Sequence, residues 1–255
     1  MKKIPLLLAL VMTCDLLFAA PQIVAHRMGA MERDENTLEA LKECASLGLK
    51  AFETDIHITK DDQLIVTHDG SLKRRCGVEG VVEDMTLEEI KKARTKDGHQ
   101  LPTLKELLTF LKDKDILMQL ELKTNGDGKR LKKLAELMVK ELKEAEFGGE
   151  RLLVISFCLE GLKFTKEFDP NISTGYLCGG SDEKNILAAK EAGCDWISAE
   201  LATTTRRFAD KVRKEGMKLA LWTIRAKRDF ELAKVLEADA FVTDLPKTMS
   251  EEWKR

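Results

Sequence analysis

The sequence predicts an α/β fold, a (β/α)8 barrel, and three observations support this prediction. The chain has 255 residues, of which 44% are hydrophobic and 34% charged, which suits one large domain with a substantial core. After residue 20, eight short apolar segments alternate with amphipathic helical segments over about 225 residues. No glycine-rich dinucleotide fingerprint follows the first apolar segment, which argues against a doubly wound open sheet.

The first 20 residues differ from the rest and predict a signal peptide. Two lysines precede an apolar run at residues 4–20, which ends in two alanines. The run is short and contains Asp15, which argues against a permanent membrane span. A lipid-modified Cys14 is the alternative, although the residues before it fit such a signal poorly. We therefore expect an exported protein, periplasmic or extracellular, with the barrel domain at residues 21–255.

Charge and cysteine content narrow the function classes. The formal net charge is -2 with acids and bases interspersed, so no basic stripe indicates a nucleic-acid partner. The six cysteines form no CxxC pair, so a zinc site is not indicated. The sequence indicates neither a disulfide pairing nor an oligomeric state.

Short apolar runs and helical periodicity place the strands and helices along the chain. Strands are expected at residues 22–25, 51–58, 116–122, 151–156, 173–177, 196–199, 218–222 and 240–242. Helices are expected at residues 36–47, 103–111, 129–145, 159–168, 182–192, 203–215 and 228–236. Residues 64–66 predict a further short strand, and residues 70–98 predict an irregular excursion with one short helix.

Capping residues predict where the helices begin. We expect Asn36 to cap the first helix, with Glu39 completing a capping box. Thr103 opens the second helix in the same way, and Thr86 opens the short helix of the excursion. The long helix at residues 129–145 is rich in charge pairs four residues apart, which stabilise an exposed helix.

A barrel of this kind places its active site at the carboxyl ends of its strands. Polar or aromatic residues lie at or near these predicted ends: His26, Glu53, Asp55, Glu121, Lys123, Trp222 and Asp244. Glu53 and Asp55 lie two residues apart on one strand and so share a face. Two adjacent carboxylates repel unless protons or a cation lie between them, and a hard divalent cation explains them best. The alternative is a strand with one polar face turned to solvent.

These residues belong to motifs that resemble those of the glycerophosphodiester phosphodiesterase family. The motifs are A-H-R-M-G at 25–29, D-E-N-T at 34–37, F-E-T-D-I at 52–56, H-D-G-S-L-K-R at 68–74, E-L-K at 121–123, W-T-I at 222–224 and V-T-D-L-P at 242–246. Each motif is short, but together and in this order they cover nearly all of the chain after residue 20. The resemblance implies a (β/α)8 TIM barrel with a small insertion after the second strand, at residues of about 59–101.

The resemblance also implies roles for matching residues. The implied metal ligands are Glu53, Asp55 and Glu121, and the implied acid–base pair is His26 and His68. The implied substrate-binding residues are Arg27 and Lys123 around the phosphate and Trp222 near the mouth of the site. The implied cofactor is one divalent cation, Mg or Ca, with Mn as a third candidate.

Each role has a structural alternative. His26 could be a core histidine, Glu121 with Lys123 a plain ion pair, Arg27 a loop anchor and Trp222 part of the barrel core. Three neighbouring residues receive other expectations. We expect His57 at the surface or behind the metal ligands, Arg74 to hold the insertion, and Asp244 to close the eighth strand.

The sequence departs from the family pattern at several positions. Met28 stands where glycine usually follows His-Arg, and a positive φ there would cost strain. Asp34 stands where proline is common, Asp62 replaces a turn glycine, and Arg75 with Cys76 replaces a threonine pair. None of these changes removes an implied ligand or acid–base group, so they bear on substrate preference.

Three functions are weighed. The leading one is metal-dependent hydrolysis of a small-molecule glycerophosphodiester to sn-glycerol 3-phosphate and an alcohol by His/His acid–base catalysis. The second is a lysophospholipase D-type hydrolase of a lipid substrate, which would need an apolar groove formed by Met28, Met31 and Trp222. The third is a non-catalytic barrel that binds phosphodiesters. Convergence of the three acids on one point would favour an enzyme.

Overall fold

The computed structural model describes residues 21–123 and 128–253, so the predicted signal peptide and Cys14 lie outside the described residues. Eight strands form the barrel: β1 (Gln22–Ala25), β2 (Ala51–Ile58), β4 (Leu117–Leu122), β5 (Leu152–Ser156), β6 (Ser173–Gly179), β7 (Trp196–Glu200), β8 (Lys218–Ile224) and β9 (Ala240–Thr243). Each pairs in parallel with its neighbours, and the β1–β2 pairing closes the sheet. The predicted barrel is confirmed.

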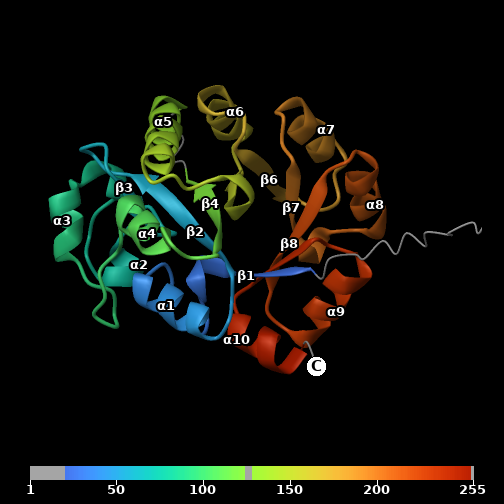
Figure 1. Cartoon of the computed structure of the whole chain (residues 1–255), viewed down its shortest axis with the longest axis horizontal. Coiled ribbons are helices and arrows are strands. Elements are labelled where there is room, and N and C mark those ends of the chain that lie inside the picture. Colours follow the sequence, from blue (N-terminus) through green and yellow to red (C-terminus); the bar gives the residue numbers. More distant parts are fainter. Residues whose placement is uncertain (1–20, 124–127, 254–255) are drawn as a thin grey trace, which may run out of the picture.

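Helices surround the strands (Figure 1). They are α1 (Leu38–Ser46), α2 (Lys73–Cys76), α3 (Leu87–Lys92), α4 (Leu104–Leu111), α5 (Gly128–Glu144), α6 (Leu159–Phe168), α7 (Lys184–Glu191), α8 (Arg206–Lys214), α9 (Lys227–Val235) and α10 (Pro246–Thr248). Short 3-10 helices occur at His26–Met28, Val82–Asp84, Gly149–Arg151 and Leu201–Thr203, and a π-helical turn at Met249–Trp253. Along the described ranges, no helix is both long and apolar enough to cross a bilayer.

Apolar side chains fill both the space between strands and helices and the barrel interior. The larger core lies between the sheet and the helices, as expected when strands alternate their side chains between two faces. Inside the barrel, small residues of β1, β2, β8 and β9 pack together, including Val24, Ala51 and Ala220. The interior is therefore a packed core, and the room for a ligand lies at one end of the barrel.

Two of the three predicted capping boxes form. The hydroxyl oxygens of Thr86 and Thr103 each accept the backbone N–H of a glutamate three residues later. The carboxylate of that glutamate accepts the backbone N–H of the threonine in return. The Asn36 prediction is wrong by one residue, because Thr37 caps α1 and accepts the N–H of Ala40 at 3.1 Å. Asn36 takes a left-handed conformation, φ 56°, and its side chain turns toward β2.

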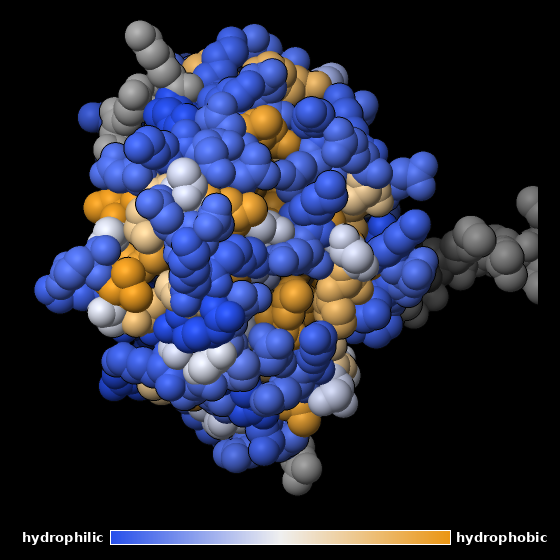
Figure 2. Space-filling model, turned by 90° about the vertical axis from the view of Figure 1, so that its left-hand side faces the viewer, coloured by the Kyte–Doolittle hydropathy of each residue, from blue (hydrophilic) through white to orange (hydrophobic). Residues whose placement is uncertain are grey.

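The segment between β2 and α4 forms a lobe beside the barrel. The strand β3 (Leu64–Val66) pairs antiparallel with the carboxyl-terminal end of β2, and the helices α2 and α3 follow it in the chain. A small core of its own includes Ile65, Leu72 and Ile90. The face of the molecule that carries this lobe is largely hydrophilic, with apolar residues in small scattered groups (Figure 2).

Candidate active site

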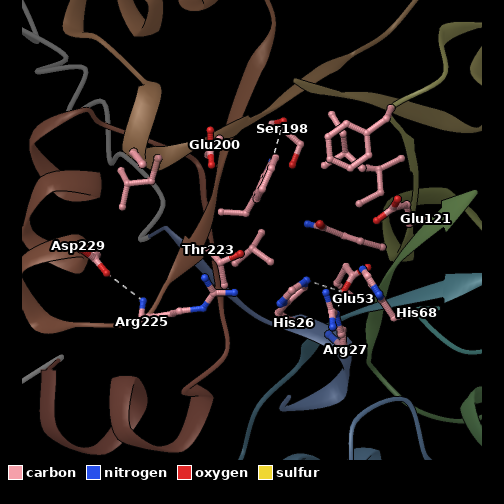
Figure 3. Close-up of a pocket in the computed structure, with 18 of the residues that line it drawn as sticks. His26, Arg27, Glu53, His68, Glu121, Ser198, Glu200, Thr223, Arg225 and Asp229 are labelled. Carbon is pink, nitrogen blue, oxygen red and sulfur yellow. Dashed lines mark hydrogen bonds and ion pairs between the residues drawn. The ribbon is translucent and has the colours of Figure 1, made fainter. Parts of the chain in front are cut away.

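A cavity of about 510 Å³ opens at the carboxyl ends of the barrel strands. Its two walls differ in chemistry. One wall is polar and includes His26, Arg27, Glu53, His68, Glu121 and Lys123, most of which are labelled in Figure 3. The other wall contains the apolar side chains, Ile155, Phe157, Leu177, Leu201, Trp222 and Leu232, and we call it the apolar wall; charged residues such as Glu200, Arg225 and Asp229 also line the cavity. The cavity therefore offers both a charged surface and apolar side chains to a ligand.

The three predicted metal ligands converge on the polar wall. Glu53 and Asp55 project from one face of β2, and Asp55 lies directly opposite Glu121 of β4 in the strand register. One oxygen from each of the three carboxylates lies within 4.8 Å of the other two. All three residues are buried, so the alternative of a solvent-facing polar strand is wrong.

Without a cation, keeping these three buried carboxylates ionised would cost free energy. Burial and the charges of Asp55 and Glu121 hold the pKa of Glu53 well above its usual range. Burial and Asp55 raise the pKa of Glu121 to about 7. Burial opposes ionisation of Asp55, but Lys123, His68 and the amide of Asn36 lower its pKa below the usual range.

The donor set fits one divalent cation. Lys123 Nζ lies 2.7 Å from Glu121 Oε1 and 3.0 Å from Asp55 Oδ1, so it neutralises part of the cluster. With all three carboxylates ionised, as cation binding requires, the cluster and the ammonium would carry two negative charges. Glu53 Oε1 is buried and has no hydrogen-bond partner among the described residues. Oxygen ligands with a residual charge of this size suit a hard divalent ion.

His26 lies at the end of β1 beside this cluster. Its Nδ1 lies 2.5 Å from Asp244 Oδ1, and its Nε2 lies 3.8 Å from Glu53 Oε2. An aspartate at Nδ1 favours the tautomer that carries its proton there, which leaves Nε2 for the cavity. Asp244 follows β9 and also accepts from Arg225 Nε at 2.5 Å. Asp244 therefore lies at the end of the eighth barrel strand, as expected, and in addition holds His26.

His68 reaches the same cavity from the loop after β3. Its Nδ1 lies 2.7 Å from Oδ1 of its own neighbour, Asp69. His57 Nε2 lies 3.1 Å from the backbone oxygen of His68 and supports that loop. His57 is buried, so of its two expected locations the surface is excluded. Both implied acid–base residues thus carry an aspartate at Nδ1.

Arg27 contacts Glu53 through its backbone and Glu35 through its side chain. Its backbone N–H donates to Glu53 Oε2 at 2.8 Å, and its guanidinium lies 3.4 Å from Glu35 Oε2. Arg27 and Met28 both have positive φ, 48° and 62°, so the backbone turns sharply after β1. The loop-anchor alternative for Arg27 does not exclude a role toward substrate, because the same residue also lines the cavity.

Met28 does not contribute to the cavity. It is fully buried in the core between sheet and helices, where the left-handed backbone turns it away from the barrel mouth. Met31 is 63% exposed and lies outside the cavity. Of the three residues expected to form an apolar groove, only Trp222 lines this cavity. Its Nε1 donates to Ser198 O at 3.0 Å, and Phe157 packs edge-to-face against its ring at 5.7 Å.

Sequence reasoning missed the contacts that hold the site residues in place. Asn36 Nδ2 donates to Asp55 Oδ2 at 2.8 Å, and its Oδ1 accepts from Thr54. Glu35, Asp69 and Asp244 bond to arginines or histidines of the site. Sequence signals existed for two of them: Asp69 directly follows His68, and Asp244 lies at a strand end, where active-site residues collect.

The position of these groups at the carboxyl ends of a closed parallel barrel defines the chain as a (β/α)8-barrel enzyme. The glycerophosphoryl diester phosphodiesterase family matches residues 26–248. The chain belongs to this family and is a phosphoric diester hydrolase.

Curated relatives agree with this assignment. A glycerophosphodiester phosphodiesterase of Caldanaerobacter subterraneus subsp. tengcongensis is 32% identical over 239 residues, which are 89% of this chain and 95% of the relative. The lysophospholipase D GDPD1 of Homo sapiens is 24% identical over 264 residues, with 88% of this chain and 83% of the relative covered.

Solved structures share the fold. A phosphodiesterase of Oleispira antarctica, in complex with its product sn-glycerol 3-phosphate, superposes with a TM-score of 0.85 at 22% identity. The superposition covers 92% of this chain and 97% of the other.

Proposed function

We propose that this enzyme hydrolyses glycerophosphodiesters to sn-glycerol 3-phosphate and an alcohol, with one divalent cation, Mg or Ca, held by Glu53, Asp55 and Glu121. The convergence of these three buried carboxylates within 4.8 Å is the observation that carries the proposal. It also argues against a non-catalytic barrel, because buried acids that bind nothing are costly. The glycerophosphodiester phosphodiesterase of Caldanaerobacter is a relative over nearly all of the chain.

The side chains of the polar wall suit attack on a phosphodiester. A bound cation would withdraw charge from a nonbridging phosphate oxygen. Arg27 and Lys123 place further positive charge beside the same position, where the transition state becomes more anionic. Together they bind the anionic ester and hold its phosphorus next to the two imidazoles.

His26 and His68 carry the protons. One imidazole takes the proton of the attacking hydroxyl, and the other gives a proton to the alkoxide as the phosphorus–oxygen bond to the leaving alcohol breaks. The attacking hydroxyl belongs either to water or to C2 of the glycerol; in the second case water opens the resulting cyclic phosphate. Each Nδ1 is bonded to an aspartate, which stabilises the imidazolium formed during this exchange.

The test is release of sn-glycerol 3-phosphate from glycerophosphocholine by the purified enzyme with Mg²⁺ or Ca²⁺. A His68→Ala variant and a His26→Ala variant should each lose activity by about 10²–10⁴-fold. Thr109→Ala, on the outer helix α4, is a matched control and should keep full activity. If either histidine variant released sn-glycerol 3-phosphate at the wild-type rate, the role of that histidine would be refuted.

A second substrate class is favoured by the apolar wall. Phe157 and Leu232 line the cavity and are 53% and 44% exposed, and Trp222 lies in the same wall. Such a wall suits an acyl chain. Lysophosphatidylcholine should therefore be assayed beside glycerophosphocholine. A Phe157→Ala substitution should raise KM for the lipid about tenfold and leave the KM for glycerophosphocholine unchanged.

We also propose that the protein is exported. The two lysines and the apolar run at residues 4–20 support this proposal. Cell fractionation with N-terminal sequencing of the mature protein tests it. A new N-terminus near residue 21 would support cleavage, a lipid-modified N-terminal Cys14 would support the anchored alternative, and an intact Met1 would contradict both.

A further inference from the structure

A chain of hydrogen bonds leads away from His68 to a buried acid that the proposed chemistry does not use. His68 Nδ1 lies 2.7 Å from Asp69 Oδ1, and Arg74 Nε donates to the other oxygen of Asp69. Arg74 Nη2 in turn donates to Glu35 Oε1 at 2.5 Å. Glu35 is 6% exposed and lies in the loop between β1 and α1, far from Asp69 in sequence.

The second carboxylate oxygen of Glu35 faces Arg27. Arg27 Nη1 lies 3.4 Å from Glu35 Oε2, and the Arg27 guanidinium is mostly buried, with 19% of the side chain exposed. Arg75 Nε lies 3.7 Å from Glu35 Oε1, and Arg75 Nη2 donates to the backbone oxygen of Glu35. One buried carboxylate therefore lies among three guanidinium groups. Arg27 lines the cavity itself, and Arg74 is connected to His68 in the cavity through Asp69.

The hydrogen bonds behind His26 start with the same imidazole–aspartate–arginine series, but this series does not lead to a buried acid. Arg225 Nε donates to Asp244 Oδ2, and Asp244 Oδ1 lies against His26 Nδ1. The same atoms connect Arg74, Asp69 and His68. Arg225 is 57% exposed, and its guanidinium contacts no second carboxylate in the described part of the chain. The anchoring acid is therefore specific to the His68 side.

We propose that Glu35 is a positioning residue that fixes two groups of the active site at once: the guanidinium of Arg27 directly, and the imidazole of His68 through Arg74 and Asp69. The inference rests on the proposed function, because it assumes that Arg27 meets the phosphate and that His68 transfers a proton. It adds that one side chain of the loop after β1 links Arg27 of that loop to Arg74 of the lobe after β2.

The two branches should affect different kinetic constants. Arg27 is placed to bind the phosphate, so loosening it should raise KM and weaken binding of phosphate. His68 acts during bond breaking, so loosening it should lower kcat. If Glu35 had a purely structural role, replacing it would lower the thermal stability and leave kcat and KM nearly unchanged.

The decisive variant is Glu35→Gln, which keeps the shape of the side chain and removes its charge. Asp34→Asn is a matched control from the neighbouring position. Asp34 is similarly buried and binds Arg75, Thr95 and His99, but neither Arg27 nor Arg74. Arg74→Gln separates the branches, because it removes the link to His68 and leaves the contact of Glu35 with Arg27.

Melting temperature, kcat and KM for glycerophosphocholine, and calorimetric binding of inorganic phosphate should be measured with Mg²⁺ present. We expect Glu35→Gln to lower kcat about tenfold and to weaken phosphate binding about tenfold. Arg74→Gln should lower kcat to a similar extent with phosphate binding unchanged, and it remains informative if Glu35→Gln fails to fold. Asp34→Asn should lower the melting temperature with kcat and phosphate binding within about twofold of wild type.

Equal effects of Glu35→Gln and Asp34→Asn on kcat and phosphate binding would overturn the proposal, as would Arg74→Gln with unchanged kcat. Failure of the proposed function would look different. Wild-type protein would then bind phosphate without turning over glycerophosphocholine or lysophosphatidylcholine, and Glu35→Gln would still weaken that binding through Arg27. Wild-type protein that neither turns over nor binds phosphate would overturn both proposals.

Discussion

Asn36 Nδ2 lies 2.8 Å from Asp55 Oδ2, and both side chains are buried. The amide of Asn36 also accepts the hydroxyl of Thr54 through Oδ1, at 2.6 Å. Its orientation is thereby fixed with the donor toward Asp55. A carboxylate of the proposed cation site thus depends on a residue in the loop that precedes α1.

Replacing this amide should weaken the cation site. Asn36→Ala removes the hydrogen-bond donor of the buried Asp55 Oδ2, which should cost about 1–3 kcal/mol of unfolding free energy. We expect Mg²⁺ affinity, measured by calorimetry, to fall about 10–100-fold. Thr37→Ala is the control, because it removes the α1 cap for about 1 kcal/mol without touching Asp55. Equal Mg²⁺ affinities in the two variants would contradict this role of Asn36.

Asp244→Asn should impair the acid–base step. The variant keeps the size of the side chain at His26 but removes the charge that stabilises an imidazolium. We expect kcat to fall about 100-fold with KM little changed, as measured on glycerophosphocholine. The control is Asp229→Asn, since Asp229 also lines the cavity but bonds to the backbone N–H of Arg225 at 3.1 Å and to Arg228, and to neither histidine. A kcat within about threefold of wild type would show that His26 does not depend on Asp244.

Met28→Gly should destabilise the protein, although glycine is usual at this position in the family. The left-handed φ of 62° strains a methionine by about 1–2 kcal/mol, which glycine would relieve. Burial of the side chain outweighs this relief, because emptying a core methionine site costs about 2–5 kcal/mol. Thermal unfolding should show a lower melting temperature by several degrees.

The control for Met28→Gly is Asp62→Gly. Asp62 has a similar φ of 59° but an exposed side chain, so it gains the backbone relief and loses little beyond an exposed ion pair with Arg130. Its melting temperature should stay close to that of wild type. If Met28→Gly raised the melting temperature, the strain would exceed the packing energy and the account would be wrong.

Glu141 on α5 should make stability fall with rising pH. Burial raises the pKa of Glu141 to about 7 despite nearby Lys105, and its Oε2 lacks a partner among the described residues. Because the folded protein holds this proton more tightly than the unfolded chain, the contribution is favourable below the unfolded pKa of about 4.5 and is lost as pH rises to about 7.

Glu141→Gln removes this titration. After allowance for partial exposure, the variant should be more stable than wild type by about 1 kcal/mol at pH 8, or about 2–4 °C in melting temperature, and by less at pH 5. Glu144→Gln, on the same helix with 59% of the side chain exposed, serves as the control and should give a wild-type pH dependence. An equal gain at both pH values in Glu141→Gln would contradict a pH-linked cause.

Most of the barrel was predictable because it follows from local pattern. Strand and helix signals alternate along the chain, and the caps at Thr86 and Thr103 need only residues three positions away. The parity of Glu53 and Asp55 correctly placed them on one face, and the register of β2 against β4 brings Glu121 beside them.

The errors arise where a distant residue competes with a local preference. Asn36 has the right side chain to cap a helix, but Asp55 and Thr54 on β2 take both ends of its amide, and Thr37 becomes the cap. The sequence offers Met28 as part of an apolar groove, but two consecutive left-handed residues, Arg27 and Met28, turn its side chain into the core.

The family departures were visible in the sequence, but their relationship was not. Arg75 Nη2 donates to Asp34 Oδ1 at 2.5 Å across the boundary between the lobe and the barrel. These residues stand at two of the positions that depart from the family pattern, 41 positions apart in the chain. Only the fold shows that these two residues form one partly buried ion pair.

The most direct test of the account is a cation titration of the EDTA-treated enzyme. Release of sn-glycerol 3-phosphate from glycerophosphocholine would be followed while Mg²⁺ or Ca²⁺ is restored, with Glu121→Gln measured in parallel. We predict no turnover in EDTA, full recovery with one bound cation per chain, and at least tenfold weaker cation affinity in Glu121→Gln. Full turnover in EDTA, or recovery that Glu121→Gln leaves unchanged, would contradict a cation held by Glu53, Asp55 and Glu121.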